Sequence, residues 1–192
     1  MPNSITPFIL ASQSPRRIEL LKEIIPDFKI VPSTVEEILQ PGLTPVENAL
    51  SLARQKALSV AKIYPGHYIL GADTIVVLDD EIIGKPRDPE EARSILRRLS
   101  GREHQVITGL SLINAAPVEE ATVSRVHIKP LSEEEISRYV ESGEPMDKAG
   151  AYAIQGNGAF MVSSYEGSYS NIVGLPLETT RRLLSRAGYP PA

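Results

Sequence analysis

The stretch YILGADTIVVLDDEII, residues 68–83, determines how the strands of this chain are arranged. Its first part, residues 68–78, is an almost uninterrupted apolar run, which is typical of a buried strand. Asp79 and Asp80 then separate this run from the short apolar pair Ile82-Ile83, as in a tight hairpin. The stretch therefore predicts two adjacent antiparallel strands, and with them a mixed sheet in place of a purely parallel one.

Helix starts are clearly marked in the rest of the chain. Ser14, Thr44 and Asp88 each precede a proline, and a cap residue followed by proline opens a helix. Glu47 and Glu91 lie three residues after their caps, as in a capping box. The expected helices cover residues 15 onward, 45 to about 63, 89–100, 132–142 and 177–187, and the other expected strands cover 8–11, 28–31, 105–112, 121–128 and 159–162. We expect one compact α/β domain, residues 1–192, in which helices flank a mixed sheet.

Composition and charge exclude several classes of protein. Apolar residues make up 42% of the chain, and no apolar run approaches the roughly 18 residues that a membrane span needs. The sequence has no cysteine, which excludes disulfides and zinc–thiolate sites, and its start does not resemble a secretory signal. The net charge of −4 provides no global basic field for nucleic acid. We expect a cytoplasmic protein that binds a small phosphorylated ligand, and neither a membrane nor nucleic acid.

Two arginines occupy the first turn of the helix that begins at Pro15. The N–H groups and the dipole make this end of a helix positive, so that Asp or Glu is the usual occupant. Arg16 and Arg17 therefore lower the stability of the helix unless an anion binds there, and Ser12 and Ser14 add two hydroxyls beside the same turn. A surface helix with solvated arginines is the alternative, but the convergence of these groups favours a phosphate site.

Asp73 and Lys56 are charged residues in otherwise apolar surroundings. A buried carboxylate is costly without a cation or several donors. The alternative for Asp73 is the solvated face of an edge strand, but Gly71 just before it allows another element to approach, which favours a general base or a metal ligand. Lys56 lies at the border of its helix's apolar stripe, from where a lysine can also reach solvent. Lys85 follows the second hairpin strand, near Asp73 if the hairpin forms.

Other patterns narrow the chemistry. The chain has neither a P-loop nor a G-x-G-x-x-G motif after a strand, and its three histidines lack metal-ligand spacing. A metal ion would therefore be held by carboxylate oxygens, which favours Mg²⁺ or Mn²⁺. Residues 144–176 contain several glycines, which indicate either loops shaped around a ligand or turns between short strands.

Several motifs follow one another along the chain. They are Ser12-x-Ser14-Pro15-Arg16-Arg17, Gly71-Ala72-Asp73-Thr74, Gly84-Lys85-Pro86, Leu99-Ser100-Gly101-x-x-His104, Asp147-Lys148-Ala149-Gly150-Ala151-Tyr152-x-Ile154-Gln155-Gly156 and Gly167-Ser168-Tyr169-x-Asn171. In type and order they resemble the Maf family of nucleoside triphosphate pyrophosphatases over nearly the whole chain. Two positions depart from the family pattern: Gln13 replaces a usual glycine, and Glu36-Glu37 stands where Asp-Glu is common.

The resemblance implies a reaction, a fold and a set of site residues. The reaction is hydrolysis of a nucleoside triphosphate between its α- and β-phosphates, and the fold is inosine triphosphatase-like, with a long mixed sheet, usually in a homodimer. Asp73 would activate the attacking water, and Glu37 would lie near a divalent metal ion. The implied phosphate ligands are Ser12, Arg16, Lys56 and Lys85, and the positions that tune base preference are Arg16, Thr74 and Gln155.

The substrate preference depends on few positions. Thr74 and Gln155 are similar to the branch of the family that acts on dTTP and UTP, with modified pyrimidine nucleotides as further candidates. A 7-methyl-GTP pyrophosphatase is one alternative, although that branch tends to carry Gln at the position of Thr74. A nucleotide-binding regulator of cell division without turnover is the other, and it would leave Asp73 without a purpose.

Overall fold

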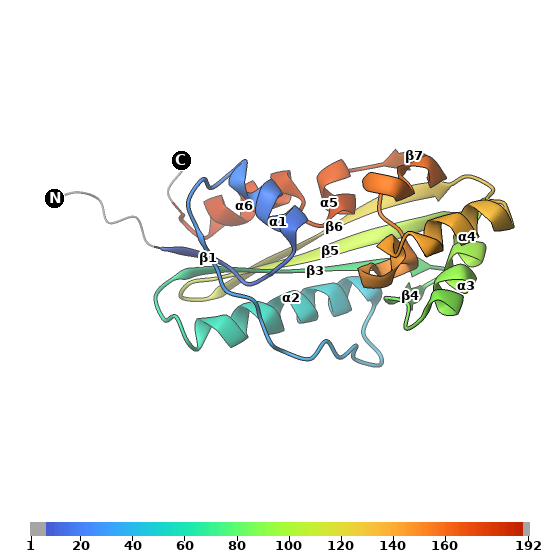
Figure 1. Ribbon diagram of the computed structural model, residues 1–192. Coiled ribbons are helices and arrows are strands. Elements are labelled where there is room, and N and C mark those ends of the chain that lie inside the picture. Colours follow the sequence, from blue (N-terminus) through green and yellow to red (C-terminus); the bar gives the residue numbers. More distant parts are fainter. Residues whose placement is uncertain (1–6, 190–192) are drawn as a thin grey trace. The chain divides into compact units, whose positions relative to one another are not determined.

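The hairpin at residues 68–83 forms as predicted (Figure 1). β3 (Tyr68–Leu78) pairs antiparallel with β4 (Glu81–Ile83), and Val76 lies opposite Ile83. Asp79 and Asp80 connect the strands with φ values of 50° and 65°. Two-residue hairpin turns require this left-handed region, which aspartate tolerates better than most residues. The acidic pair can therefore form the turn without a glycine.

A computed structural model describes residues 7–189, which divide into two compact units. Unit 1 contains residues 7–73, 108–122 and 174–189, and unit 2 contains residues 74–107 and 123–173. β3, β5 (Glu103–Ile113) and β6 (Pro117–Ile128) have residues in both units. Residues 1–6 and 190–192 of the predicted domain lie outside the described residues.

Within residues 7–189, seven strands form one mixed sheet. The strands follow the order β2-β1-β3-β5-β6-β7, with β4 paired to β3. β1 (Phe8–Leu10) is parallel to β2 (Lys29–Ile30) and to β3, whereas β7 (Val162–Glu166) is antiparallel to β6. The prediction of an α/β fold with a mixed sheet and flanking helices is confirmed.

In unit 1, α2 (Pro45–Ala61) packs closely on the sheet because two strand glycines leave room for it (Figure 1). A Cβ atom at Gly71 would lie 2.2 Å from the carbonyl oxygen of Ala53, and one at Gly109 would lie 2.4 Å from that of Ala49. Side chains alternate along a strand, so Asp73 points to the same side of β3 as Gly71, toward α2.

The other helices of unit 1 are α1 (Pro15–Lys22) and α6 (Leu177–Arg186). Their apolar side chains join those of β1, β3 and β5 in one buried cluster. Its fully buried members include Leu10, Leu21, Leu70, Leu110 and Leu183. The N-terminal turn of α1 is thus fixed by the packing of the helix behind it.

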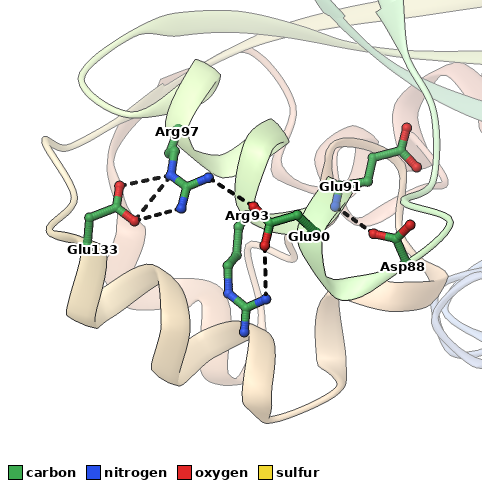
Figure 2. A network of polar contacts seen from close by, with 6 residues as sticks. All are labelled: Asp88, Glu90, Glu91, Arg93, Arg97 and Glu133. Carbon is green, nitrogen blue, oxygen red and sulfur yellow. Dashed lines mark hydrogen bonds and ion pairs between the residues drawn. The ribbon is translucent and has the colours of Figure 1, made fainter.

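Unit 2 contains α3 (Pro89–Leu99), α4 (Glu133–Glu141), α5 (Tyr169–Val173) and the 3-10 helices η1 (Glu144–Asp147), η2 (Ala149–Ala151) and η3 (Gly156–Met161). Figure 2 shows Arg97 of α3 between Glu90 and Glu133, which it meets at 3.4 Å and 2.9 Å. All three side chains are exposed. Exposed pairs of this kind contribute little to stability, so the contact between α3 and α4 depends mainly on their apolar faces.

The predicted helix caps are present, with one difference at α3. The side chains of Ser14, Thr44 and Asp88 each accept an N–H from the residue three positions later, and so does that of Ser132 at the start of α4. Thr44 with Glu47 and Ser132 with Glu135 form complete capping boxes. At α3 the carboxylate of Glu91 instead accepts the backbone N–H and the guanidinium of Arg87, at 2.7 Å and 2.8 Å. The basic side chain just before the cap redirects the carboxylate.

The strand predicted at residues 159–162 is wrong. η3 occupies this segment and β7 begins only at Val162. The carboxylate of Glu144 accepts the Asn157 N–H at 2.9 Å, and the Val162 N–H donates to the Ala159 carbonyl group, which closes a turn. An apolar run of four residues is too short to distinguish a strand from a helical turn, and local hydrogen bonds decide it here.

Candidate active site

Asp73 and Lys56, the two misplaced charges of the sequence, form an ion pair in unit 1. The Lys56 Nζ atom lies 2.5 Å from Asp73 Oδ1. The side chains are 12% and 7% exposed, respectively, so both charges are largely removed from solvent. The solvated edge-strand interpretation of Asp73 is therefore wrong, and Lys56 turns inward and not to solvent. α2 can place the ammonium there because Gly71 lets the helix approach β3.

Glu37 supplies a second carboxylate to the same lysine. Its Oε1 atom lies 2.6 Å from Lys56 Nζ, and its side chain is 48% exposed. Glu37 belongs to residues 31–40, which form neither helix nor strand. A buried and a half-exposed carboxylate thus meet on one ammonium group.

The start of α1 carries the predicted phosphate-binding groups. The buried Ser12 hydroxyl accepts hydrogen bonds from the Ser14 N–H at 3.3 Å and from Arg17 Nη1 at 3.4 Å. Arg17 Nε donates to the Gly174 carbonyl group at 2.9 Å. These bonds orient the hydroxyl and one arginine at the positive end of the helix.

The pKa of Arg17 shows that this turn and the two carboxylates share one electrostatic environment. Burial lowers the pKa of the guanidinium below its usual value, the charges of Asp73 and Glu37 oppose that shift, and the charge of Arg16 adds to it. The residue pattern indicated both arginines, whereas the family resemblance assigned only Arg16 to the phosphates. Arg17 is also a site residue by position, and the doubled arginine was the signal for it.

Arg16 itself is half-buried, and its side chain makes no hydrogen bond or ion pair within residues 7–189. Its neighbour Arg17 is fixed by Ser12 and Gly174, whereas Arg16 has its donors available. A guanidinium with free donors at a helix N-terminus can bind a phosphate through two parallel bonds.

The remaining predicted residues lie in unit 2. Thr74 follows Asp73 on β3 and points to the opposite side of the strand. β4 runs antiparallel to β3, with Ile83 opposite Val76. The chain after Ile83, which includes Lys85, therefore continues along β3 in the direction of Thr74. Lys85 and Gln155 are exposed, and neither side chain has a polar partner in the described part of the chain. The structure thus joins Ser12, Glu37, Lys56 and Asp73 with the two arginines in unit 1, and it places Thr74, Lys85 and Gln155 in unit 2.

The carboxylate oxygens of the site can be compared with the ligands that a divalent cation requires. Residues 7–189 contain no group of three or more His, Asp or Glu side chains that could hold a metal ion alone. Mg²⁺ commonly takes only one or two carboxylates and completes its coordination with water and substrate phosphates. Glu37 and Asp73 fit that role, as two hard oxygen donors that meet at Lys56.

Among the described residues, no helix is long and apolar enough to cross a membrane.

Comparisons with known proteins place the chain in a family. A family model described as "Maf-like protein" matches residues 7–187. The dTTP/UTP pyrophosphatase of Symbiobacterium thermophilum is 50% identical over 185 residues, which cover 95% of this chain and 94% of the relative. That of Dictyoglomus thermophilum is 50% identical over 186 residues, with 94% and 96% covered.

Solved structures give weaker matches. The Ham1 protein of Staphylococcus aureus has a TM-score of 0.46 and 20% identity, and the match covers 63% of this chain and 71% of that one. A nucleoside-triphosphatase / dITP/XTP pyrophosphatase from Mycobacterium abscessus has a TM-score of 0.44 and 17% identity, with 63% and 73% covered. The family match spans nearly the whole described chain, and so does the identity to the curated relatives: the chain belongs to the Maf family.

Proposed function

We propose that this protein is a nucleotide pyrophosphatase that hydrolyses dTTP and UTP to the monophosphate and pyrophosphate. Relatives with half of their residues identical over nearly the whole chain carry the name dTTP/UTP pyrophosphatase. The observation that carries the proposal is the buried Asp73 carboxylate on Lys56, beside a helix start with two arginines. Modified pyrimidine nucleotides are further candidates as substrates.

Asp73 is the proposed general base. Attack of water on a phosphoryl centre requires an aligned nucleophile and neutralisation of charge more than covalent chemistry. The Asp73 carboxylate can accept a proton from a water molecule, and the Lys56 ammonium, 2.5 Å away, compensates its charge in the buried site. This arrangement supplies a base at a position from which bulk solvent is largely excluded.

The phosphates are bound by positive groups of the chain. In unit 1 these are the N-terminus of α1, Arg16 and Lys56, with the Ser12 hydroxyl beside them. The family motif assigns Lys85 to the phosphates and Thr74 and Gln155 to base preference, and these assignments in unit 2 are part of the proposal. Arg16 is the residue most available for substrate, since Arg17 already binds Ser12 and Gly174.

A divalent cation, Mg²⁺ or Mn²⁺, is proposed as cofactor, and Glu37 would hold it together with Asp73. Such an ion neutralises the charge that develops on the phosphate oxygens. Glu37 is suited to this role because it is half-exposed and can reorient. Lys56 binds both carboxylates, and it would keep them close together until substrate and metal enter.

The setting of the reaction follows from the family resemblance and the composition. We propose a single functional domain that includes both units, a homodimer, and action in the cytoplasm on free nucleotides. The net charge of −4 supports small nucleotides in preference to nucleic acid.

A substrate panel tests the proposal. Purified protein with Mg²⁺ or Mn²⁺ is given dTTP, UTP, CTP, 7-methyl-GTP, GTP or ATP, and pyrophosphate and orthophosphate are measured separately. Pyrophosphate mainly from dTTP and UTP is expected. Pyrophosphate mainly from 7-methyl-GTP would keep the reaction and refute the base preference, and binding without any turnover would favour the regulator.

A further inference from the structure

Glu37 lies on a segment that is fastened to α2 along its length. We define residues 33–40 as the strap. The hydroxyl oxygens of Ser33 and Ser59 lie 2.9 Å apart, Glu37 meets Lys56 at 2.6 Å, and Gln40 Nε2 donates to the Ser51 hydroxyl at 3.3 Å. The residue numbers rise along the strap as they fall along α2. The strap therefore runs antiparallel to the helix, with Glu37 in its middle.

The partners on α2 form a polar stripe. At about 100° per residue, positions 48, 51, 56 and 59 fall within one side of the helix. Polar residues on a helix that packs on a sheet usually form its solvated face. On α2 these polar residues bind the strap instead.

Asn48 is the most buried member of this stripe, with 3% of its surface exposed. Its Oδ1 atom accepts the Gln40 N–H at 2.8 Å, and its Nδ2 group donates to the carbonyl groups of Gln40, Leu43 and Thr44 at 3.4, 3.2 and 3.4 Å. The side chain needs both its acceptor and its donors for these bonds, which only an amide of this length provides here.

The two ends of the strap are fixed in different ways. Ser33 binds Ser59 through hydroxyl groups that are partly exposed, whereas Gln40 is held through its backbone by the buried Asn48. Glu37 is half-exposed, so burial does not fix its position. Three residues of extended chain span roughly 10 Å, so release of Gln40 would let the Glu37 carboxylate move by several ångströms.

We propose that Asn48 is a positioning residue: by fixing the backbone of Gln40, it sets where Glu37 meets the Lys56 ammonium group that also binds Asp73. Its effects on turnover and on cation binding rest on the proposed function, whereas its effect on the strap does not. An amide that merely stabilised the start of α2 would change stability without changing cation binding. Loss of a residue that orients a metal ligand typically weakens metal affinity or activity by about 10- to 100-fold.

Two variants and one control separate these roles. Asn48→Ala removes the whole contact, whereas Asn48→Asp keeps the acceptor for the Gln40 N–H and loses the donors. Glu47→Ala is the control, because it removes the capping box with Thr44 on the same helix turn and does not touch the strap. Two quantities are measured for each protein. They are the hydrogen exchange of the strap amides, residues 34–40, and Mn²⁺ binding, followed by the electron paramagnetic resonance of free Mn²⁺.

We expect faster exchange of the strap amides and an increase of about tenfold or more in the Kd for Mn²⁺ in Asn48→Ala, with a smaller change in Asn48→Asp. Glu47→Ala should keep the Kd of the parent protein, even at a lower melting temperature. Unchanged strap exchange in both Asn48 variants would overturn the proposal. So would faster exchange with an unchanged Kd, or a parent protein that binds no Mn²⁺. Absence of turnover in the parent protein on every nucleotide would refute the proposed function alone.

Discussion

Replacement of His104 by Gln should remove a pH dependence of stability. His104 lies in β5 with 2% of its surface exposed, and its Nε2 atom is 2.7 Å from the Tyr152 hydroxyl oxygen. Burial lowers the pKa of His104 from 6.5 to about 4, and the nearby charge of His127 acts in the same direction. The contact with His104 fixes the position of Tyr152. Tyr152 lies three residues before Gln155, which the family resemblance assigns to base preference.

The size of the effect follows from the two pKa values of His104. The unfolded chain binds a proton at this ring below about pH 6.5, whereas the folded chain binds it only below about pH 4. The neutral ring therefore favours the folded state fully above pH 6.5, and this contribution is lost as the pH falls. Between pH 7 and pH 5 the linkage relation gives a loss of about 2 kcal/mol from this one residue.

The assay is urea unfolding of the parent protein and of His104→Gln at pH 7 and pH 5. Carboxylates also titrate in this range, but they are common to both proteins and cancel in the difference. The free energy of unfolding of the parent should fall by about 2 kcal/mol more than that of the variant. Equal pH dependence in the two proteins would refute the assignment of His104 as a buried neutral ring.

The structure makes three further predictions about stability. Lys56→Met should lower the free energy of unfolding by about 3 kcal/mol in urea unfolding, because it leaves a buried carboxylate unpaired, and Asp73→Asn added to it should recover much of the loss. No recovery would contradict the pairing. Gly71→Ala should lower the melting temperature strongly, since the new Cβ would lie 2.2 Å from the Ala53 carbonyl oxygen, and an unchanged melting temperature would refute the close approach of α2. Arg97→Ala should cost less than about 1 kcal/mol in urea unfolding, because its ion pairs are exposed, and a larger loss would show that they matter more than their exposure suggests.

Local signals predicted much of the fold. Ser14, Thr44 and Asp88 cap helices that begin at the next residue, because a cap acts through hydrogen bonds within one turn. The Asp79-Asp80 turn was equally local, and it adds an antiparallel pair of strands to the sheet. Gly71 predicted that another element lies close to β3, and in the structure this element is α2. The sequence did not reveal which element it would be.

From the residues alone, the site could be predicted only where a residue conflicts with its own surroundings, whereas Glu37 came from the family resemblance. Asp73 and Lys56 each stood out in an apolar context, and they form an ion pair. The first turn of α1 indicated both arginines, but the sequence could not show that Arg17 binds Ser12 and Gly174 while Arg16 does not, because this depends on the packing of α1. The role of Asn48 was hidden as well, because its partners are backbone groups of a segment without helix or strand.

Pyrophosphate release by Asp73→Asn tests the central claim most directly. The rate from dTTP and UTP is compared with that of the parent protein at saturating nucleotide and metal, after circular dichroism has shown that the variant is folded. Asp73 as general base predicts a rate lower by about 10²-fold or more, with nucleotide binding retained. A folded Asp73→Asn protein with a rate near that of the parent would contradict the claim.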